Sequence, residues 1–240
     1  MSIPKIIHYI QFEEQMKDQK QLQKEEKCMK TWKDKLNGHE FVKWSSENFD
    51  IAACPYTNAC LQINRWDLIE NYIKAYALKE QGGIFFSNEI MVLDQFDDLL
   101  DFHMFFGFEH STHISNTVVA AEKDNKFCIE FVDHLDKLIG SKEGMTLEYE
   151  GYLTTVLKEK YHLLFNNQEQ LLEGNIKVYS NETFINPSIN SKTILINAEN
   201  CNGKNNSFWN RMDQNKRMKI QNKEQAEKYR KKQENKISLL

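Results

Sequence analysis

Polar side chains follow a short apolar run near the middle of the chain. A glycine pair, Gly82 and Gly83, opens this run, residues 84–86 are apolar, and Ser87-Asn88-Glu89 comes directly after them. A buried strand that ends in polar residues is where many α/β proteins hold a metal ion or the phosphates of a nucleotide. Only one of these three polar side chains, Glu89, is a carboxylate, so the segment offers a metal ion less negative charge than paired carboxylates would.

The elements that must position these residues follow from hydrophobic periodicity and from helix-breaking residues. Apolar runs predict strands at residues 3–12, 40–44, 85–90, 102–108 and 117–121. Apolar residues recurring at three- and four-residue steps predict helices at 64–80, 126–139 and 149–161, and a charged stretch without Gly or Pro predicts a further helix within 13–35. Strands that alternate with helices indicate an α/β fold with a mixed or parallel sheet.

Length and composition fit one domain followed by a tail. The chain has 240 residues, of which 40% are hydrophobic and 28% charged. A chain of this length can bury a sizeable core. We expect a single domain over residues 1–212 and a basic, helical tail over 213–240. Between residues 213 and 236 there are nine Lys and Arg against four Asp and Glu. Such a segment is either a solvated helix or an attachment site for an anionic membrane surface or an acidic partner.

The cellular setting follows from the cysteines and from the apolar runs. Five cysteines without metal-type spacing indicate reduced thiols and argue against a structural zinc site. No apolar run approaches the ~20 residues that cross a bilayer, and the first residues do not have the pattern of a signal peptide. We therefore expect a cytoplasmic protein, peripheral to the membrane if the tail binds lipid. Nucleic acid is not an expected partner, because no recognition motif accompanies the basic tail.

A series of landmarks resembles the DXD-motif glycosyltransferases, which include N-glycan mannosyltransferases and capsular-polysaccharide sugar transferases. That family carries Gly-Gly-Ile-Tyr-Leu-Asp-x-Asp-Val where this chain keeps Gly82, Gly83 and Ile84 but has Ser87 and Glu89 at the two Asp positions. Other segments match the family in the same order along the chain, at residues 3–10, 31–33, 43–44, 55–56, 65–66, 107–109, 122–123 and 174–187. The resemblance implies a GT-A-like, Rossmann-like mixed sheet flanked by helices and a nucleotide-sugar donor.

The same resemblance marks candidate site residues and shows where they depart from the family. Its members hold the diphosphate of the donor through Mn²⁺ or Mg²⁺ on the DXD carboxylates, so with Ser87 and Glu89 we expect weak metal binding, with Glu89 as the remaining ligand. Asn71 and Lys74 stand where the family has Asp and Arg for sugar and phosphate contacts. Toward the C-terminus, Asn197 and Ala198 stand where the family has a pair of histidines.

The remaining donor-binding candidates are aromatic or close to the glycine turn. Tyr9 follows the opening strand at a position similar to the nucleotide-binding edge of the family, and Trp66 could stack on a base or a sugar. Gly83 belongs to the retained glycine pair. Aromatic residues at helical spacing are also typical of a core, so these positions have a structural interpretation as well.

Two functions remain open from the sequence. The first is a degenerate glycosyltransferase of surface or capsular polysaccharide synthesis that binds a glycan or pairs with an active transferase. The second is an active, metal-dependent retaining transferase in which Glu89 and either Asp94 or Glu109 hold the metal ion. The histidines His103, His110 and His113 offer an alternative metal site, although histidines between strands are more often surface residues. No catalytic residue is assigned.

Overall fold

The computed structural model describes residues 2–13, 15, 17–139, 149–184 and 195–197. Helical segments are α1 (Gln19–Lys35), α2 (Pro55–Gln62), α3 (Trp66–Gln81), the short 3-10 helix η1 (Asp97–Leu99), α4 (Lys126–Lys137), α5 (Tyr149–Tyr161) and α6 (Asn181–Phe184). Strands are β1 (Ile6–Ile10), β2 (Glu40–Trp44), β3 (Gly83–Phe86), β4 (Ile90–Val92), β5 (Met104–His110), β6 (His113–Ala121), β7 (Gln170–Leu172), β8 (Ile176–Tyr179) and β9 (Leu195–Asn197).

Within the described residues, seven strands form the main sheet in the order β2-β1-β3-β6-β5-β8-β7, and β4 pairs with β9 in a second, two-stranded sheet. β1 is parallel to β2 and β3, and β5 is parallel to β8. β6 runs antiparallel to both of its neighbours, β3 and β5, and β7 is antiparallel to β8. The predicted α/β class with a mixed sheet flanked by helices is therefore confirmed.

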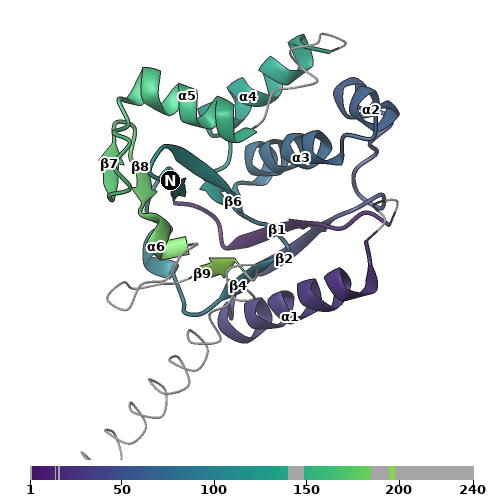
Figure 1. The fold of residues 1–240 in the computed structure, drawn as a ribbon, viewed down its shortest axis with the longest axis horizontal. Coiled ribbons are helices and arrows are strands. Elements are labelled where there is room, and N and C mark those ends of the chain that lie inside the picture. The colour runs from purple at the N-terminus through teal and green to yellow at the C-terminus, as the bar shows by residue number, and fades with distance from the viewer. Residues whose placement is uncertain (1, 14, 16, 140–148, 185–194, 198–240) are drawn as a thin grey trace, which may run out of the picture. The chain divides into compact units, whose positions relative to one another are not determined.

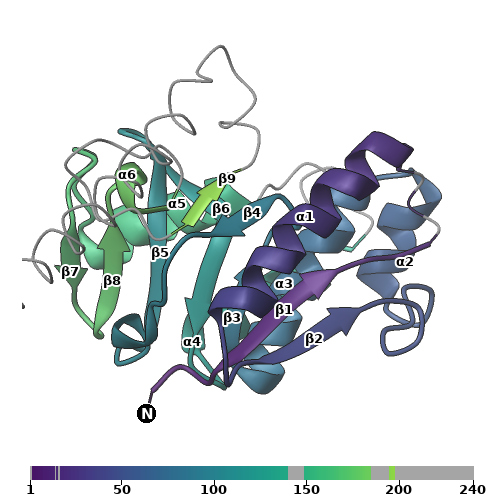
Figure 2. The ribbon, with the colours of Figure 1, turned by 90° about the horizontal axis from the view of Figure 1, so that it is seen from below.

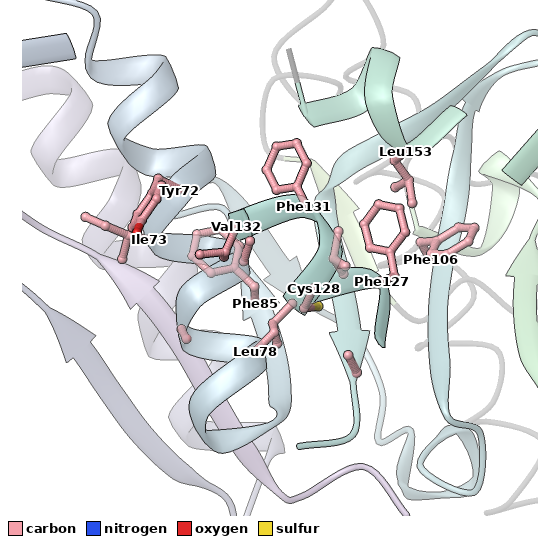
Figure 3. Packing of buried hydrophobic residues seen from close by; sticks show 14 of the residues in the cluster. Tyr72, Ile73, Leu78, Phe85, Phe106, Phe127, Cys128, Phe131, Val132 and Leu153 are labelled. Carbon is pink, nitrogen blue, oxygen red and sulfur yellow. The ribbon is translucent and has the colours of Figure 1, made fainter. Parts of the chain in front are cut away.

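Each face of the main sheet is covered by helices (Figure 1), with α2, α3, α4 and α5 on one side and α1 on the other. The β3 strand is buried throughout, and its side chains alternate between the two resulting cores: Phe85 packs with the α2–α5 layer, whereas Ile84 and Phe86 pack with the α1 layer. In the first core, Phe127 and Phe131 of α4 gather with Leu153 of α5 against Phe106 of the sheet (Figure 3).

The glycine pair that ends α3 has the role that its sequence predicts. Gly82 has φ 66° and Gly83 has φ 111°, a region that side chains other than glycine rarely adopt. A Cβ atom on Gly82 would lie 2.5 Å from the backbone nitrogen of Lys123, and one on Gly83 would lie 2.6 Å from the carbonyl oxygen of Ile6. The chain can therefore enter β3 beside β1 only because neither residue has a side chain.

Several predicted elements have different bounds in the structure: β6, predicted over 117–121, begins at His113, and two further differences lie near the polar end of β3. The strand predicted over residues 85–90 ends at Phe86, because the Ser87 carbonyl accepts the N–H of Ile90 and so closes a turn, although the Ser87 N–H still donates to the Thr117 carbonyl of β6. The helix predicted within 13–35 begins at Gln19, where the Asp18 carboxylate accepts the Gln21 N–H at 2.7 Å and caps the helix. The sequence reading missed α2, although Pro55 at its first turn is a typical start signal.

The tail and part of the C-terminal region lie outside the described residues. The domain boundary at 212 and the helical tail over 213–240 therefore stay predictions, as does any role for Ala198. Among the described cysteines, Cys28, Cys54, Cys60 and Cys128 are free thiols. None of the helices in the described part of the chain is both long and apolar enough to span a membrane.

Candidate functional site

A pocket of about 320 Å³ lies where β1 and β3 end and β6 begins. α3 supplies one wall, and α1 with the segment before it supplies the other; in Figure 2, α1 lies in front of β1 and α3 behind it. At this point the strand order reverses, because β2 lies on one side of β1 and β3 lies on the other. Pockets at the carboxyl ends of strands, where the order of an α/β sheet changes, are its usual ligand sites.

The residues that line this pocket are mostly polar. They are Ile10, Gln15, Lys17, Gln21, Glu25, Asp67, Glu70, Asn71, Lys74, Phe85, Phe86, Ser87, Asn88, Glu89 and Asn116. Of the candidates that the sequence named, the structure brings together Asn71, Lys74, Ser87 and Glu89 around one cavity. At each of these four positions the chain departs from the family that it resembles, as it also does at Asn197 and Ala198.

The turn after β3 is tied to both of its neighbours. The Asn88 side-chain amide donates to the Ile10 carbonyl at 2.7 Å and to the Glu25 carboxylate at 3.3 Å. One side chain therefore joins the end of β1, the turn and α1. Because Asn88 is only 9% exposed, these bonds are shielded from water and hold the polar end of β3 in one position.

Two lysines on the α1 side neutralise two of the pocket carboxylates. The Lys24 ammonium donates to the Glu89 carboxylate at 2.9 Å, and both side chains are 22% exposed. The Lys17 ammonium donates to Glu25 at 2.9 Å, with side-chain exposures of 11% and 2%. Burying a charged carboxylate as deeply as Glu25 is unfavourable unless a cation is paired with it.

The α3 wall carries Asn71 and Lys74, both buried. The Lys74 ammonium donates to the Asn71 side-chain oxygen at 3.3 Å and to the Asn116 carbonyl at 3.0 Å, and it lies 5.0 Å from the centre of the Phe85 ring. A cation over an aromatic face is stabilised by the ring. These contacts hold the Lys74 charge at the floor of the pocket, between α3 and the first residues of β6.

Gln15 leaves one polar atom for a ligand. Its amide nitrogen donates to the Glu70 carboxylate at 2.8 Å. Its amide oxygen is buried, and no donor among the described residues lies within hydrogen-bonding distance of it. A buried acceptor without a donor is unfavourable, and a ligand hydroxyl would satisfy it.

Three other predicted site residues lie away from the pocket lining. Tyr9 packs edge-on against Trp32 at 5.7 Å, and burial raises the pKa of its hydroxyl. Trp66 packs against Phe12 with ring centres 6.1 Å apart. Gly83 serves the close approach of β3 to β1. The structure gives each of them a packing contact, as the structural interpretation of aromatic and glycine positions predicts.

The sequence reading missed the contribution of α1. It treated the stretch from 13 to 35 as a charged helix with a narrow buried stripe. Glu25 occupies a position in that stripe, since it is buried together with Cys28 and Trp32 at steps of three and seven residues. A charged residue at an apolar position of a helix is therefore the signal that could have identified Glu25 as part of the site.

The Ser87 and Glu89 positions do not offer a divalent cation the donors that it needs. Glu89 already binds the Lys24 ammonium, and Ser87 offers a neutral hydroxyl. In the described ranges, no group of three or more His, Cys, Asp or Glu residues is placed to hold a metal ion. Asp94 and Glu109, the other carboxylates considered with Glu89, are not in the lining, and His110 and His113 are exposed at the β5–β6 connection.

The sequence matches no family model and no curated protein. Solved structures similar to this chain include PaToxG glycosyltransferase, with 15% identity, a TM-score of 0.51 and coverage of 66% of this chain and 69% of that one. A glycosyltransferase involved in glycosylation of the major capsid of PBCV-1 covers 80% of this chain and 92% of its own length, with 10% identity and a TM-score of 0.41. The match to the GlyE glycosyltransferase of Streptococcus pneumoniae TIGR4 covers 80% of this chain and 54% of that one, with 10% identity and a TM-score of 0.47.

At such low identity these similarities concern the fold alone, and the PaToxG structure carries the comparison. The described part of the chain has a GT-A-type fold, a mixed sheet flanked by helices as in that glycosyltransferase. The fold class predicted from the residues and from the resemblance is confirmed at this level.

Proposed function

We propose that this chain is a glycosyltransferase-type protein that binds a nucleotide sugar or a glycan in the pocket at the end of β3, with catalysis impaired or lost. One observation carries the proposal. Asn71, Lys74, Ser87 and Glu89 line the same pocket, and the Glu89 carboxylate is held by Lys24. This arrangement supports a ligand site at the position expected for the fold, in which the groups that would hold a catalytic metal ion are changed.

The chemistry supports impaired transfer more than impaired binding. Transfer from a nucleotide sugar needs a strong positive charge to stabilise the departing diphosphate, which a divalent cation supplies in DXD enzymes. Ser87 contributes no charge to such a cation, and Glu89 would have to leave Lys24 to reach it. Binding asks for less, because hydrogen bonds from Asn71, Lys74 and Gln15 can hold hydroxyl and phosphate groups without activating a leaving group.

Active metal-dependent transfer is the second candidate. Four carboxylates line the pocket, namely Glu25, Asp67, Glu70 and Glu89, and an acidic group near the donor could serve as a base or could bind Mn²⁺ or Mg²⁺. In the structure these carboxylates contact Lys17, Arg65, Gln15 and Lys24, respectively. Donor hydrolysis with and without Mn²⁺ distinguishes the two candidates.

The test is calorimetric titration of Mn²⁺ and nucleoside diphosphates into the unmodified chain and a Ser87→Asp, Glu89→Asp double variant. The double variant has carboxylates at both position 87 and position 89, which restores negative charge for the metal ion. We therefore expect a gain in Mn²⁺-dependent affinity of about tenfold, or about 1.4 kcal/mol. The matched control is Ser87→Asn with Glu89→Gln, which has similar volumes and no charge. Tight Mn²⁺-dependent binding by the unmodified chain, together with donor turnover, would contradict loss of catalysis.

A role beside an active transferase or at a membrane belongs to the same proposal. A binding protein of surface or capsular polysaccharide synthesis could hold a glycan acceptor for an active partner.

The basic segment 213–236 could attach the chain to an anionic membrane surface. Deleting this segment should leave the melting temperature almost unchanged and weaken sedimentation with phosphatidylserine vesicles. Equal sedimentation before and after deletion would remove membrane attachment from the proposal.

A further inference from the structure

Lys24 occupies the place on Glu89 that a divalent cation would need. Its ammonium lies 2.9 Å from a Glu89 carboxylate oxygen, which is the distance of a strong charge-assisted hydrogen bond. A metal ion at Glu89 would have to displace this ammonium and lose part of its own hydration shell, and Mg²⁺ dehydrates reluctantly. With one carboxylate and one hydroxyl at Ser87 and Glu89, there is little negative charge to offset either penalty.

An ammonium can also perform the bridging that a metal ion performs in such a site. It carries three N–H donors, so one lysine can donate to a carboxylate and to a phosphate oxygen at the same time. Lys24 and Glu89 both remain 22% exposed, and Glu89 lines the pocket. Lys24 is not itself in the pocket lining, so a phosphate group would reach its ammonium beside the Glu89 carboxylate to which it is bonded.

Two further lysines place positive charge at the same cavity, which four carboxylates, Glu25, Asp67, Glu70 and Glu89, also line. The side chains of Lys17 and Lys74 both line the pocket, Lys17 from the segment before α1 and Lys74 from α3. Lys17 is fixed by Glu25, and Lys74 is fixed by Asn71 and Asn116. The buried Gln15 oxygen adds an acceptor that suits a ligand hydroxyl. Phosphate groups and hydroxyl groups together are the chemistry of a nucleoside diphosphate or a sugar phosphate.

We infer that this pocket binds a diphosphate-containing ligand without a divalent cation, with the Lys24 ammonium taking the place of the metal ion on Glu89. This inference rests on the proposed function, since it assigns the ligand of the same pocket. The inference differs from the proposed function in one measurable respect, namely whether binding requires a metal ion. The Lys24 ammonium bridges the Glu89 carboxylate and the phosphate, and Lys17 keeps the buried Glu25 neutralised.

The experiment titrates ADP, CDP, GDP and UDP into the full chain in EDTA and again in Mn²⁺. We expect at least one of them to bind with the same affinity in both buffers. Lys24→Gln should weaken binding in EDTA by at least about tenfold, because a charge-assisted hydrogen bond is lost. The same variant should now bind Mn²⁺ more tightly, because Glu89 is released. Lys24→Arg, which keeps the charge, should retain binding in EDTA.

Two more variants keep the result interpretable. Lys27→Gln removes an exposed lysine of the same helix that does not line the pocket, and it should bind as the unmodified chain does. Glu89→Gln removes the carboxylate that positions the Lys24 ammonium but keeps the ammonium itself, so binding in EDTA should weaken, and by less than in Lys24→Gln. Circular dichroism of each variant checks that it is folded.

The outcomes separate this inference from the proposed function. Binding of a diphosphate only in Mn²⁺, or unchanged binding by Lys24→Gln in EDTA, would overturn the inference while supporting a nucleotide pocket. Failure of the folded, unmodified chain to bind any of the four diphosphates or a glycan in either buffer would overturn the proposed function and the inference with it.

Discussion

At the amino-terminal end of β3, Gly82 and Gly83 lie against neighbouring backbone so closely that a Cβ atom would come within 2.5–2.6 Å of it. At the carboxyl-terminal end of the same strand, Ser87-Asn88-Glu89 faces a pocket and is held by hydrogen bonds and an ion pair with other elements. The first end is fixed by steric fit and the second by polar pairing. Substitutions at the two ends should therefore act on different properties, namely stability at the first and ligand binding at the second.

The largest effect is expected for Gly83→Ala. The new methyl group would meet the Ile6 carbonyl oxygen at 2.6 Å and the His8 ring at 3.0 Å, with the backbone at φ 111°. We expect the free energy of unfolding to fall by about 3 kcal/mol or more, because strain and overpacking add. Urea denaturation measures it. Gly151→Ala is the matched control, since a Cβ there meets nothing within 4 Å, and equal stability of the two variants would contradict a steric role for Gly83.

The second prediction concerns pH and uses His8, which is fully buried beside the glycine turn. Its Nε2 lies 2.7 Å from the Gly82 carbonyl oxygen and its Nδ1 accepts the Trp44 indole N–H at 3.2 Å, so a neutral ring that donates from Nε2 satisfies both contacts. Burial disfavours the charged ring and lowers the pKa of His8 from 6.5 to about 4. The stability that this neutral ring contributes is present above pH 6.5 and is lost as the pH falls toward 4.

We expect the free energy of unfolding to drop by about 2–3 kcal/mol between pH 7 and pH 4.5 through His8. His8→Gln keeps a donor and an acceptor but does not titrate, so it should flatten this part of the profile. The buried His39 also has a lowered pKa, caused mainly by burial, and will leave a residual slope. Parallel profiles for the unmodified chain and His8→Gln would show that His8 does not control the acid transition.

At the polar end, the third prediction concerns the buried pair of Glu25 and Lys17. Glu25→Gln leaves the Lys17 ammonium without its anionic partner, so we expect a loss of about 2 kcal/mol in the free energy of unfolding. Glu26→Gln, at an exposed neighbouring position, should change stability by less than about 0.5 kcal/mol. A double-mutant cycle with Lys17→Met measures the coupling, and a coupling near zero would mean that the pair does not stabilise the segment before α1 against α1.

The smallest effect on stability is expected for Asn71→Ala. Asn71 accepts one hydrogen bond from Lys74, and its loss should lower the free energy of unfolding by about 1 kcal/mol. Its effect on ligand binding should be larger, about tenfold in the affinity for a nucleoside diphosphate. Gln62→Ala, an exposed position on α2, should change neither quantity. Unchanged ligand affinity in Asn71→Ala would remove this residue from the binding surface.

The two ends of β3 also differ in how far the sequence could predict them. Three features of this segment are local. The glycine pair indicates backbone with positive φ, the apolar run indicates a strand buried on both faces, and the polar residues after it indicate a turn. The helices α3, α4 and α5 follow from hydrophobic spacing in the same way. These features are encoded by neighbouring residues, so the α/β class could be predicted from the sequence, whereas the turn at residues 87–90 falls inside the strand that the sequence predicted over 85–90.

The partners of the polar side chains could not be predicted in this way. Lys24 and Glu89 are 65 positions apart, and Asn88 reaches Ile10 across 78, so only the packing of α1 against the sheet brings them together. The sequence alone determined that Glu89 would be a single carboxylate at the end of a buried strand. The tertiary structure decided that this carboxylate binds a lysine, because the charge nearest to a group in space is set by the fold and not by its neighbours in the chain.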